Sequence, residues 1–152
     1  MKKRGLAALG ALALGGALLV GGRWFGLGGA AAYAPDLARG EAIYAEACAS
    51  CHGAALEGEP DWRTRKPNGR LPAPPHDESG HTWHHPDSVL LEITARGTAA
   101  VVGGGYESDM PGFGEAYSED ELRDVLAWIK SQWPEPIQAR QEALTAQDEA
   151  RR

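Results

Sequence analysis

Cys48, Cys51 and His52 carry the most specific chemistry in the sequence. The two cysteines are three residues apart, and the histidine directly follows the second one. This C-x-x-C-H spacing is the attachment pattern of a c-type haem, in which each thiol adds across a vinyl group. The same turn would place the His52 imidazole beneath the iron as its proximal ligand. The chain has two cysteines in all, so no other thiol competes for them.

A plain disulfide and a thioredoxin-like redox couple are the alternative interpretations of the cysteine pair. A thioredoxin-like couple requires a strand before the pair and a βαβ context. Residues 36–47 are instead typical of a helix that Asp36 can cap. The residues that share one face of this helix are Leu37, Gly40, Tyr44 and Ala47. The pattern therefore favours haem attachment.

Met110 is the one methionine besides the initiator, and it follows His52 by 58 residues. It lies in a run from Gly103 to Gly114 whose glycines and proline indicate a loop. A methionine commonly completes the coordination of a cytochrome iron. The sequence therefore predicts Met110 as the distal ligand. A methionine that fills a gap in the core is the alternative, and so many glycines disfavour it.

A second helix is expected after this loop. Ser118 can act as its N-cap and Glu121 as the partner in a capping box, and Pro134 ends the helical run. The apolar residues that recur at helical spacing are Leu122, Val125, Leu126 and Ile129.

With these features the sequence resembles class I cytochromes c in their bacterial single-haem form, from about Pro35 to Pro134. The resemblance implies an all-α fold, with several helices wrapped around one covalently bound haem c and its iron. It also implies that the first and last helices cross closely, through a glycine and two aromatic residues. The matching residues are Gly40, Tyr44 and Trp128.

The resemblance further implies two residues that support the haem. In this family a loop carbonyl next to a proline accepts the N–H of the proximal histidine. Pro74 is taken as that residue, with Pro72 and Pro75 as alternatives. A tryptophan commonly donates its indole N–H to a haem propionate, and Trp83 is the candidate. A plain core aromatic is the alternative for Trp83.

Four of the five histidines lie between residues 76 and 85: His76, His81, His84 and His85. One interpretation is a copper or zinc site, because imidazole suits both metals. The favoured interpretation is a loop that contacts the haem. Replacement of Met110 by one of these histidines, which would give bis-histidine iron, is a further possibility.

A basic run precedes this loop in an otherwise acidic chain. Its members are Arg63, Arg65, Lys66 and Arg70. A solvated loop is the default interpretation, and neutralisation of propionates or docking of an acidic partner are the alternatives.

The first 34 residues are predicted to be a signal sequence or a membrane anchor. A basic start, Lys2 to Arg4, precedes an uncharged run over residues 5–22. The run is long enough to span a membrane, and Arg23-Trp24-Phe25 is typical of an interfacial anchor. Small residues over 30–34 offer cleavage sites, but a retained anchor is favoured. We therefore expect the domain on the periplasmic side of the bacterial cytoplasmic membrane.

The remaining residues suggest one domain over 35–134 and a polar tail or surface helix over 135–152. Four of the 15 basic residues and none of the 21 acidic ones precede residue 35, which leaves a formal charge of −10. This balance argues against nucleic acid as a partner, because phosphate binding needs a basic face. The modest apolar content also predicts that folding depends on the haem.

The function expected from these features is one-electron transfer between redox partner proteins, not catalysis. An iron with both axial positions filled has no open position for a substrate. The alternatives are a haem enzyme or gas sensor with a displaceable distal ligand, and a copper-handling protein that uses the loop from His76 to His85.

Overall fold

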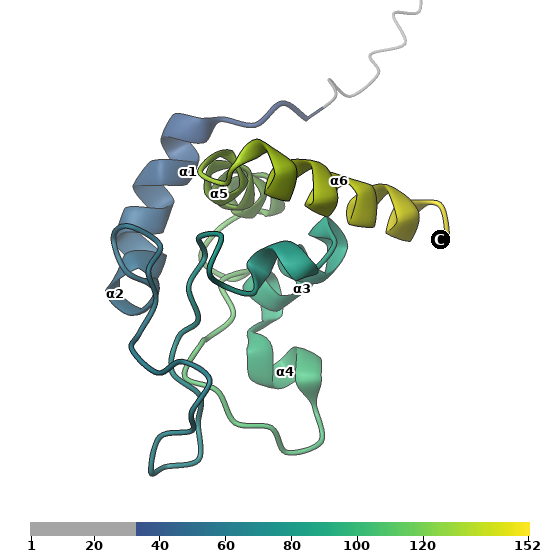
Figure 1. Ribbon diagram of the computed structural model, residues 1–152. Helices are drawn as coiled ribbons and strands as arrows, with labels where there is room; N and C mark the ends of the chain where they lie inside the picture. The colour runs from purple at the N-terminus through teal and green to yellow at the C-terminus, as the bar shows by residue number, and fades with distance from the viewer. Residues whose placement is uncertain (1–32) are drawn as a thin grey trace, which may run out of the picture. The chain divides into compact units, whose positions relative to one another are not determined.

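A computed structural model describes residues 33–152, which form helices and connecting loops (Figure 1). Residues 1–32, and with them most of the predicted signal or anchor segment, lie outside the described residues. The described range contains no β-strand. None of its helices combines the length and the apolar composition that a membrane span requires. The helical elements are α1 (Leu37–Ile43), the π-helix η1 (Tyr44–Cys48), α2 (Ala49–His52), the 3-10 helix η2 (Thr82–His84), α3 (Asp87–Arg96), α4 (Thr98–Val102), α5 (Glu119–Ser131) and α6 (Glu135–Glu149).

The helix that leads to Cys48 is regular in its first part. Asp36 caps α1 as predicted, because its side chain accepts the N–H of Arg39 at 3.0 Å. At Tyr44 the helix widens into η1, which the periodicity of the sequence does not reveal. A π-helical turn inserts an extra residue and is frequent at functional sites. It rotates the cysteine-bearing turn relative to the buried face of α1.

The buried face of α1 differs from the prediction at one end. Gly40 and Tyr44 are buried as expected, and Ile43 is buried with them. Leu37 is 45% exposed, because it lies one turn before the point at which α1 crosses α5.

The predicted close crossing of α1 and α5 is confirmed (Figure 1). A Cβ atom on Gly40 would lie 2.2 Å from the carbonyl oxygen of Asp124 and 3.0 Å from Cβ of Trp128. One turn further, the rings of Tyr44 and Trp128 pack with their centroids 4.8 Å apart. The missing side chain at position 40 is therefore what lets the two backbones touch.

The sequence signals of α5 also hold in the structure. Ser118 and Glu121 form the predicted capping box. All four residues that recur at helical spacing are buried: Leu122, Val125, Leu126 and Ile129. Two residues of this face, Val125 and Ile129, belong to the core cluster that includes Ile43 and Tyr44.

The segment after Pro134 is a helix, α6, so of the two alternatives the tail is wrong. Gln141 on α6 is fully buried, and its amide nitrogen donates to the carbonyl of His85 at 3.2 Å and to Oδ1 of Asp87 at 2.6 Å. Just before α6, the indole N–H of Trp133 donates to the carbonyl of His76 at 2.6 Å. The C-terminal part of the chain therefore holds the histidine-rich loop in place.

Asp124 ties the N-terminal end of the domain to α5. Its side chain has no exposed area and accepts the hydroxyl of Tyr33 at 2.7 Å and the N–H of Asp36 at 2.9 Å. Its second oxygen pairs with the guanidinium of Arg39. Burial alone would raise the pKa of the Asp124 carboxyl, but these donors outweigh burial and lower the pKa.

The crossing makes Gly40→Ala destabilising, although alanine is the better helix former by about 1 kcal/mol. We expect the variant to lose about 1–3 kcal/mol of stability, because the new methyl group meets backbone atoms that cannot move freely. Chemical denaturation of the haem-loaded protein measures this loss. The exposed Ala42→Gly on the same helix is the control, and it should lose about 1 kcal/mol. A Gly40→Ala variant as stable as the wild type would refute the close contact between the backbones of α1 and α5.

The Asp124 network should make stability fall at acid pH. A carboxyl whose pKa is lowered by folding stabilises the native state above its unfolded pKa, about 3.9 for Asp. That contribution is lost as the pH falls through the lower native pKa. We expect the melting temperature of Asp124→Asn to decline less steeply below about pH 4 than that of the wild type. Asp120→Asn, an exposed change on the same helix, should follow the wild type; equal slopes for all three proteins would contradict the assignment.

Candidate functional site

The C-x-x-C-H residues lie together on the turn formed by the end of η1 and by α2. Cys48 is half-buried against the hydrophobic core, Cys51 is exposed, and His52 is buried with 7% exposure. The two thiols are not joined by a disulfide. The turn therefore presents two sulfur atoms and an imidazole from one short stretch of backbone.

His52 is held by one hydrogen bond that defines its chemistry. Its Nδ1 lies 2.8 Å from the carbonyl oxygen of Pro74. Because a carbonyl can only accept, Nδ1 carries the proton and the lone pair is on Nε2. Burial lowers the pKa of the His52 imidazole despite this bond, so the ring is neutral at pH 7. A neutral ring with a free Nε2 is the form that binds a metal ion.

Pro74 reaches His52 because the segments around Glu59 and Ala73, which are 14 positions apart in the sequence, run side by side. Glu59 N–H donates to the carbonyl of Ala73 at 2.9 Å, and the carboxylate of Glu59 accepts the N–H of Ala73 at 2.7 Å. A Cβ atom on Gly58 would lie 2.5 Å from the nitrogen of Pro75, so only glycine fits there. The residues between these segments form a side loop. Of the three prolines considered, Pro74 supplies the acceptor.

Met110 is half-buried in the loop that follows α4, and the hydroxyl of Thr98 donates to its sulfur atom at 3.3 Å. The chain directly after Met110 is fixed to α3, because Phe113 N–H donates to Thr94 at 2.9 Å and Gly114 N–H to Ala95 at 3.0 Å. The thioether therefore sits on a loop that is anchored on its C-terminal side.

The histidine-rich loop does not form the metal site considered from the sequence. His76 stacks on His52 with ring centroids 4.0 Å apart, and its Nδ1 contacts the hydroxyl of Thr82 at 2.6 Å. Burial, and next the nearby His52, lower the pKa of His76 well below its usual value. His81 and His85 pair with each other at 3.0 Å between Nε2 atoms. Across residues 33–152 no group of three or more His, Cys, Asp or Glu side chains is placed to hold a metal ion.

The stacking of His76 on His52 also bears on bis-histidine ligation. Two histidines that bind one haem iron stand on opposite sides of the porphyrin. Rings stacked 4.0 Å apart leave no room for a macrocycle between them. His76 is therefore a proximal-side neighbour of His52 in this structure.

Trp83 lies on η2, in the histidine-rich loop. Its indole N–H donates to the carbonyl of Glu78 at 3.2 Å, within the same loop. The ring packs against the hydrophobic core, with Arg140 over one face. These contacts are those of a partly buried aromatic beside the core, and donation to a haem propionate stays a prediction.

A thioredoxin-like couple fits the structure poorly. Such a couple needs a cysteine with a lowered pKa. Burial, with a smaller effect of Cys51, instead raises the pKa of the Cys48 thiol to about 11. The pair also follows a helix, and the described residues form no strand to precede it.

The donor set fits haem c. Two thiols on one helical turn match the two vinyl groups, and the buried neutral imidazole offers Nε2 to the iron. Sequence reasoning missed two supports of this set: the hydroxyl of Tyr44, which donates to the carbonyl of Gly53 at 2.8 Å, and the Glu59 contacts that position Pro74. The first joins η1 to the C-cap of α2 and has no recognised sequence signal, and the second depends on the pairing of the Glu59 and Ala73 segments.

Comparison with known proteins agrees with this geometry. A family model described as Cytochrome c matches residues 37–133. No curated protein and no solved structure matches the chain. Proteins of this family bind haem c covalently and transfer electrons with it, and Cys48 and Cys51 have the spacing of the family motif. The chain therefore belongs to the cytochrome c family, with an all-α class I cytochrome fold and a covalently bound haem c with its iron as cofactor.

Proposed function

We propose that this protein carries single electrons on a haem ligated by His52 and Met110, and that it has no catalytic activity. The observation that carries this proposal is the His52 imidazole, which is buried, neutral and oriented by Pro74 on the turn that bears both thiols. When bound, the haem supplies a one-electron iron couple. The residues of the chain would have to hold the haem and keep its two ligands in place.

The chain's residues would keep both axial positions filled. Pro74 fixes the orientation of the His52 ring, and Thr98 fixes the side chain of Met110 through its sulfur. Thioether bonds from Cys48 and Cys51 would prevent loss of the cofactor. A site with two protein ligands and no vacant position favours electron transfer over binding of a substrate or a gas.

The location of the protein follows from residues 1–34, which we propose to be an export signal retained as a membrane anchor. This would hold the domain at the periplasmic face of the cytoplasmic membrane. The intact mass of the mature protein distinguishes the two fates, because a start beyond Ala30 means that the segment is removed.

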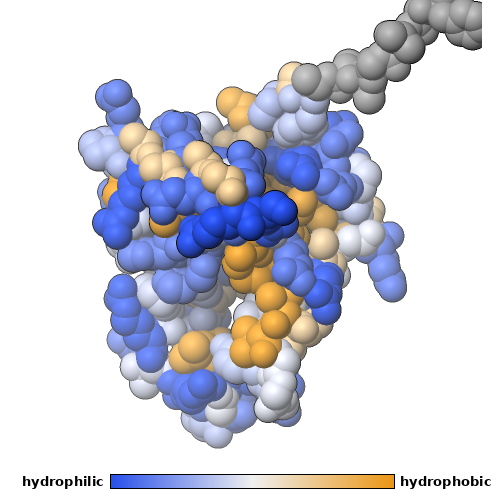
Figure 2. Space-filling model, turned by 90° about the vertical axis from the view of Figure 1, so that its right-hand side faces the viewer, coloured by the Kyte–Doolittle hydropathy of each residue, from blue (hydrophilic) through white to orange (hydrophobic). Residues whose placement is uncertain are grey.

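The partners that we propose are redox proteins that dock transiently. Such encounters use small contact areas. Apolar residues gather in a band down the face shown in Figure 2, between hydrophilic residues. Val102, at the end of α4 and before the Met110 loop, is 57% exposed. Contact of a partner with Val102 would bring that partner close to the segment that carries the proposed distal ligand, Met110.

Substitution of Met110 tests the proposed ligand set. The oxidised wild type should show the weak far-red absorption band of an iron–sulfur bond. Met110→Leu should lose this band completely and bind cyanide at least about tenfold faster, because no protein ligand must first dissociate. Glu115→Gln, an exposed change in the same loop, should keep the band and the slow binding.

Two results would contradict this ligand set. A wild type without the far-red band at neutral pH would exclude methionine ligation. Rapid and tight binding of cyanide or carbon monoxide to the wild type would favour the haem enzyme or gas sensor instead.

A further inference from the structure

The segment just before Met110 is held differently from the segment just after it. Beyond Met110, two backbone hydrogen bonds fix the chain to α3. Over residues 103–109, the backbone bonds found within the described structure stay inside the loop or reach the end of α4. An added Cβ at Gly104 or Gly105 would meet nothing within 4 Å. The backbone therefore leaves this side of Met110 loosely attached.

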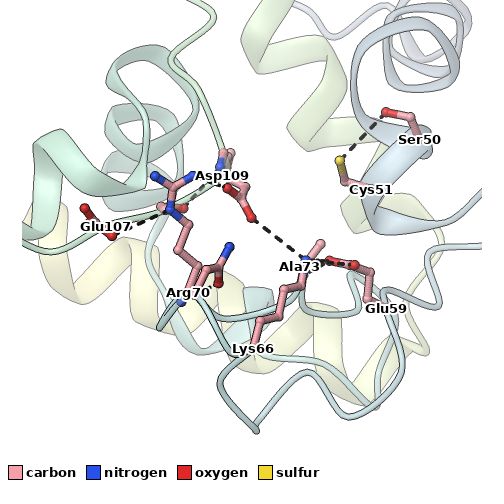
Figure 3. A network of polar contacts seen from close by, with 11 residues as sticks. Ser50, Cys51, Glu59, Lys66, Arg70, Ala73, Glu107 and Asp109 are labelled. Atoms are coloured by element: carbon pink, nitrogen blue, oxygen red, sulfur yellow. Dashed lines mark hydrogen bonds and ion pairs between the residues drawn. The ribbon is translucent and has the colours of Figure 1, made fainter.

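Two cations from the basic run make the missing attachment (Figure 3). The guanidinium of Arg70 donates to Oδ1 of Asp109, the residue next to Met110, and its Nε lies 3.8 Å from Glu107. The ammonium of Lys66 lies 3.9 Å from Oδ2 of Asp109. Asp109 thus faces two positive charges from a distant segment, of which Arg70 lies 39 positions before it in the sequence.

One of these cations, Lys66, is also tied to the segment that orients His52. Lys66 donates to both carboxylate oxygens of Glu59, at 3.0 and 3.1 Å. Glu59 in turn accepts the N–H of Ala73, next to Pro74. The N–H of Lys66 donates to the carbonyl of Arg70 at 2.9 Å, which fixes the two cations relative to each other. A chain of polar contacts therefore runs from the Pro74 segment to the Met110 segment.

We propose that Lys66, Arg70 and Asp109 form an ionic clamp that positions Met110 as a ligand, an inference that rests on the proposed His52 and Met110 ligation. The clamp ties the loop that carries Pro74 to the loop that carries Met110. It acts on the residues just before Met110, whose backbone hydrogen bonds within the described structure do not reach beyond the loop and the end of α4. Asp109, Lys66 and Arg70 are positioning residues, since they act on the iron only through Met110. Two residues of the basic run, Lys66 and Arg70, would then do more than form a solvated loop.

The expected effect is modest and depends on salt. The side chains of Arg70 and Asp109 are 37% and 45% exposed, so water and ions weaken their attraction. Release of Met110 is a local opening of one loop, however, and a small change in free energy shifts such an equilibrium several-fold. The clamp should therefore appear in ligand exchange and hardly at all in global stability.

Imidazole binding to the oxidised, haem-loaded protein at pH 7 tests the clamp. Imidazole must displace Met110, so the far-red band reports the exchange directly. We expect Asp109→Asn and Arg70→Gln each to bind imidazole about two- to fivefold more tightly than the wild type at low salt. In 1 M KCl the wild type should approach the variants, while the variants change little. Glu119→Gln, which breaks the exposed Arg123 pair on α5, is the matched control and should follow the wild type.

The outcomes separate the clamp from the ligand set. If the wild type has the far-red band and both variants bind imidazole as it does, the clamp is refuted and the Met110 ligand stands. If the wild type lacks the band, the ligand set fails and the clamp fails with it. Tighter binding by both variants, with loss of the salt effect and an unchanged Glu119→Gln control, supports the clamp. Use of two variants guards against a folding defect in either one.

Discussion

The hydrogen bond from His52 Nδ1 to the carbonyl of Pro74 is the contact on which the chemistry of the site depends. It decides which nitrogen carries the proton, and burial keeps the ring neutral. The bond exists only because the segments around Glu59 and Ala73 pair with each other, and because Gly58 admits the backbone of Pro75. Most of the loop architecture between α2 and η2 can be understood as support for this contact.

The helices provide the frame for that loop. The crossing of α1 and α5 requires glycine at position 40, and the cysteine-bearing turn continues directly from α1 through η1. At the other end of the domain, α6 and Trp133 hold the histidine-rich loop by hydrogen bonds to the backbone of His76 and His85. The frame is small in apolar area, which agrees with a domain whose core includes a cofactor.

Local signals in the sequence predicted the features that depend on local physics. The capping residues Asp36 and Ser118 and the apolar face of α5 follow from helix geometry, whereas the glycine at the crossing was implied by the resemblance to class I cytochromes c. The π-helical turn, the Trp83 contact and the clamp at Asp109 could not be predicted in this way. The clamp depends on which loops meet in space, and residues 58–70 give no periodic signal for that pairing. The basic run can be recognised in the sequence, but Asp109, the carboxylate that pairs with Arg70, lies 39 residues further along the chain.

Covalent attachment of haem to Cys48 and Cys51 is the central claim, and one preparation tests it most directly. Protein matured in a host that attaches haem c should be coloured, should keep its colour under denaturing conditions, and should show no reaction of either thiol with an alkylating reagent. A colourless protein with both thiols open to alkylation would contradict the account.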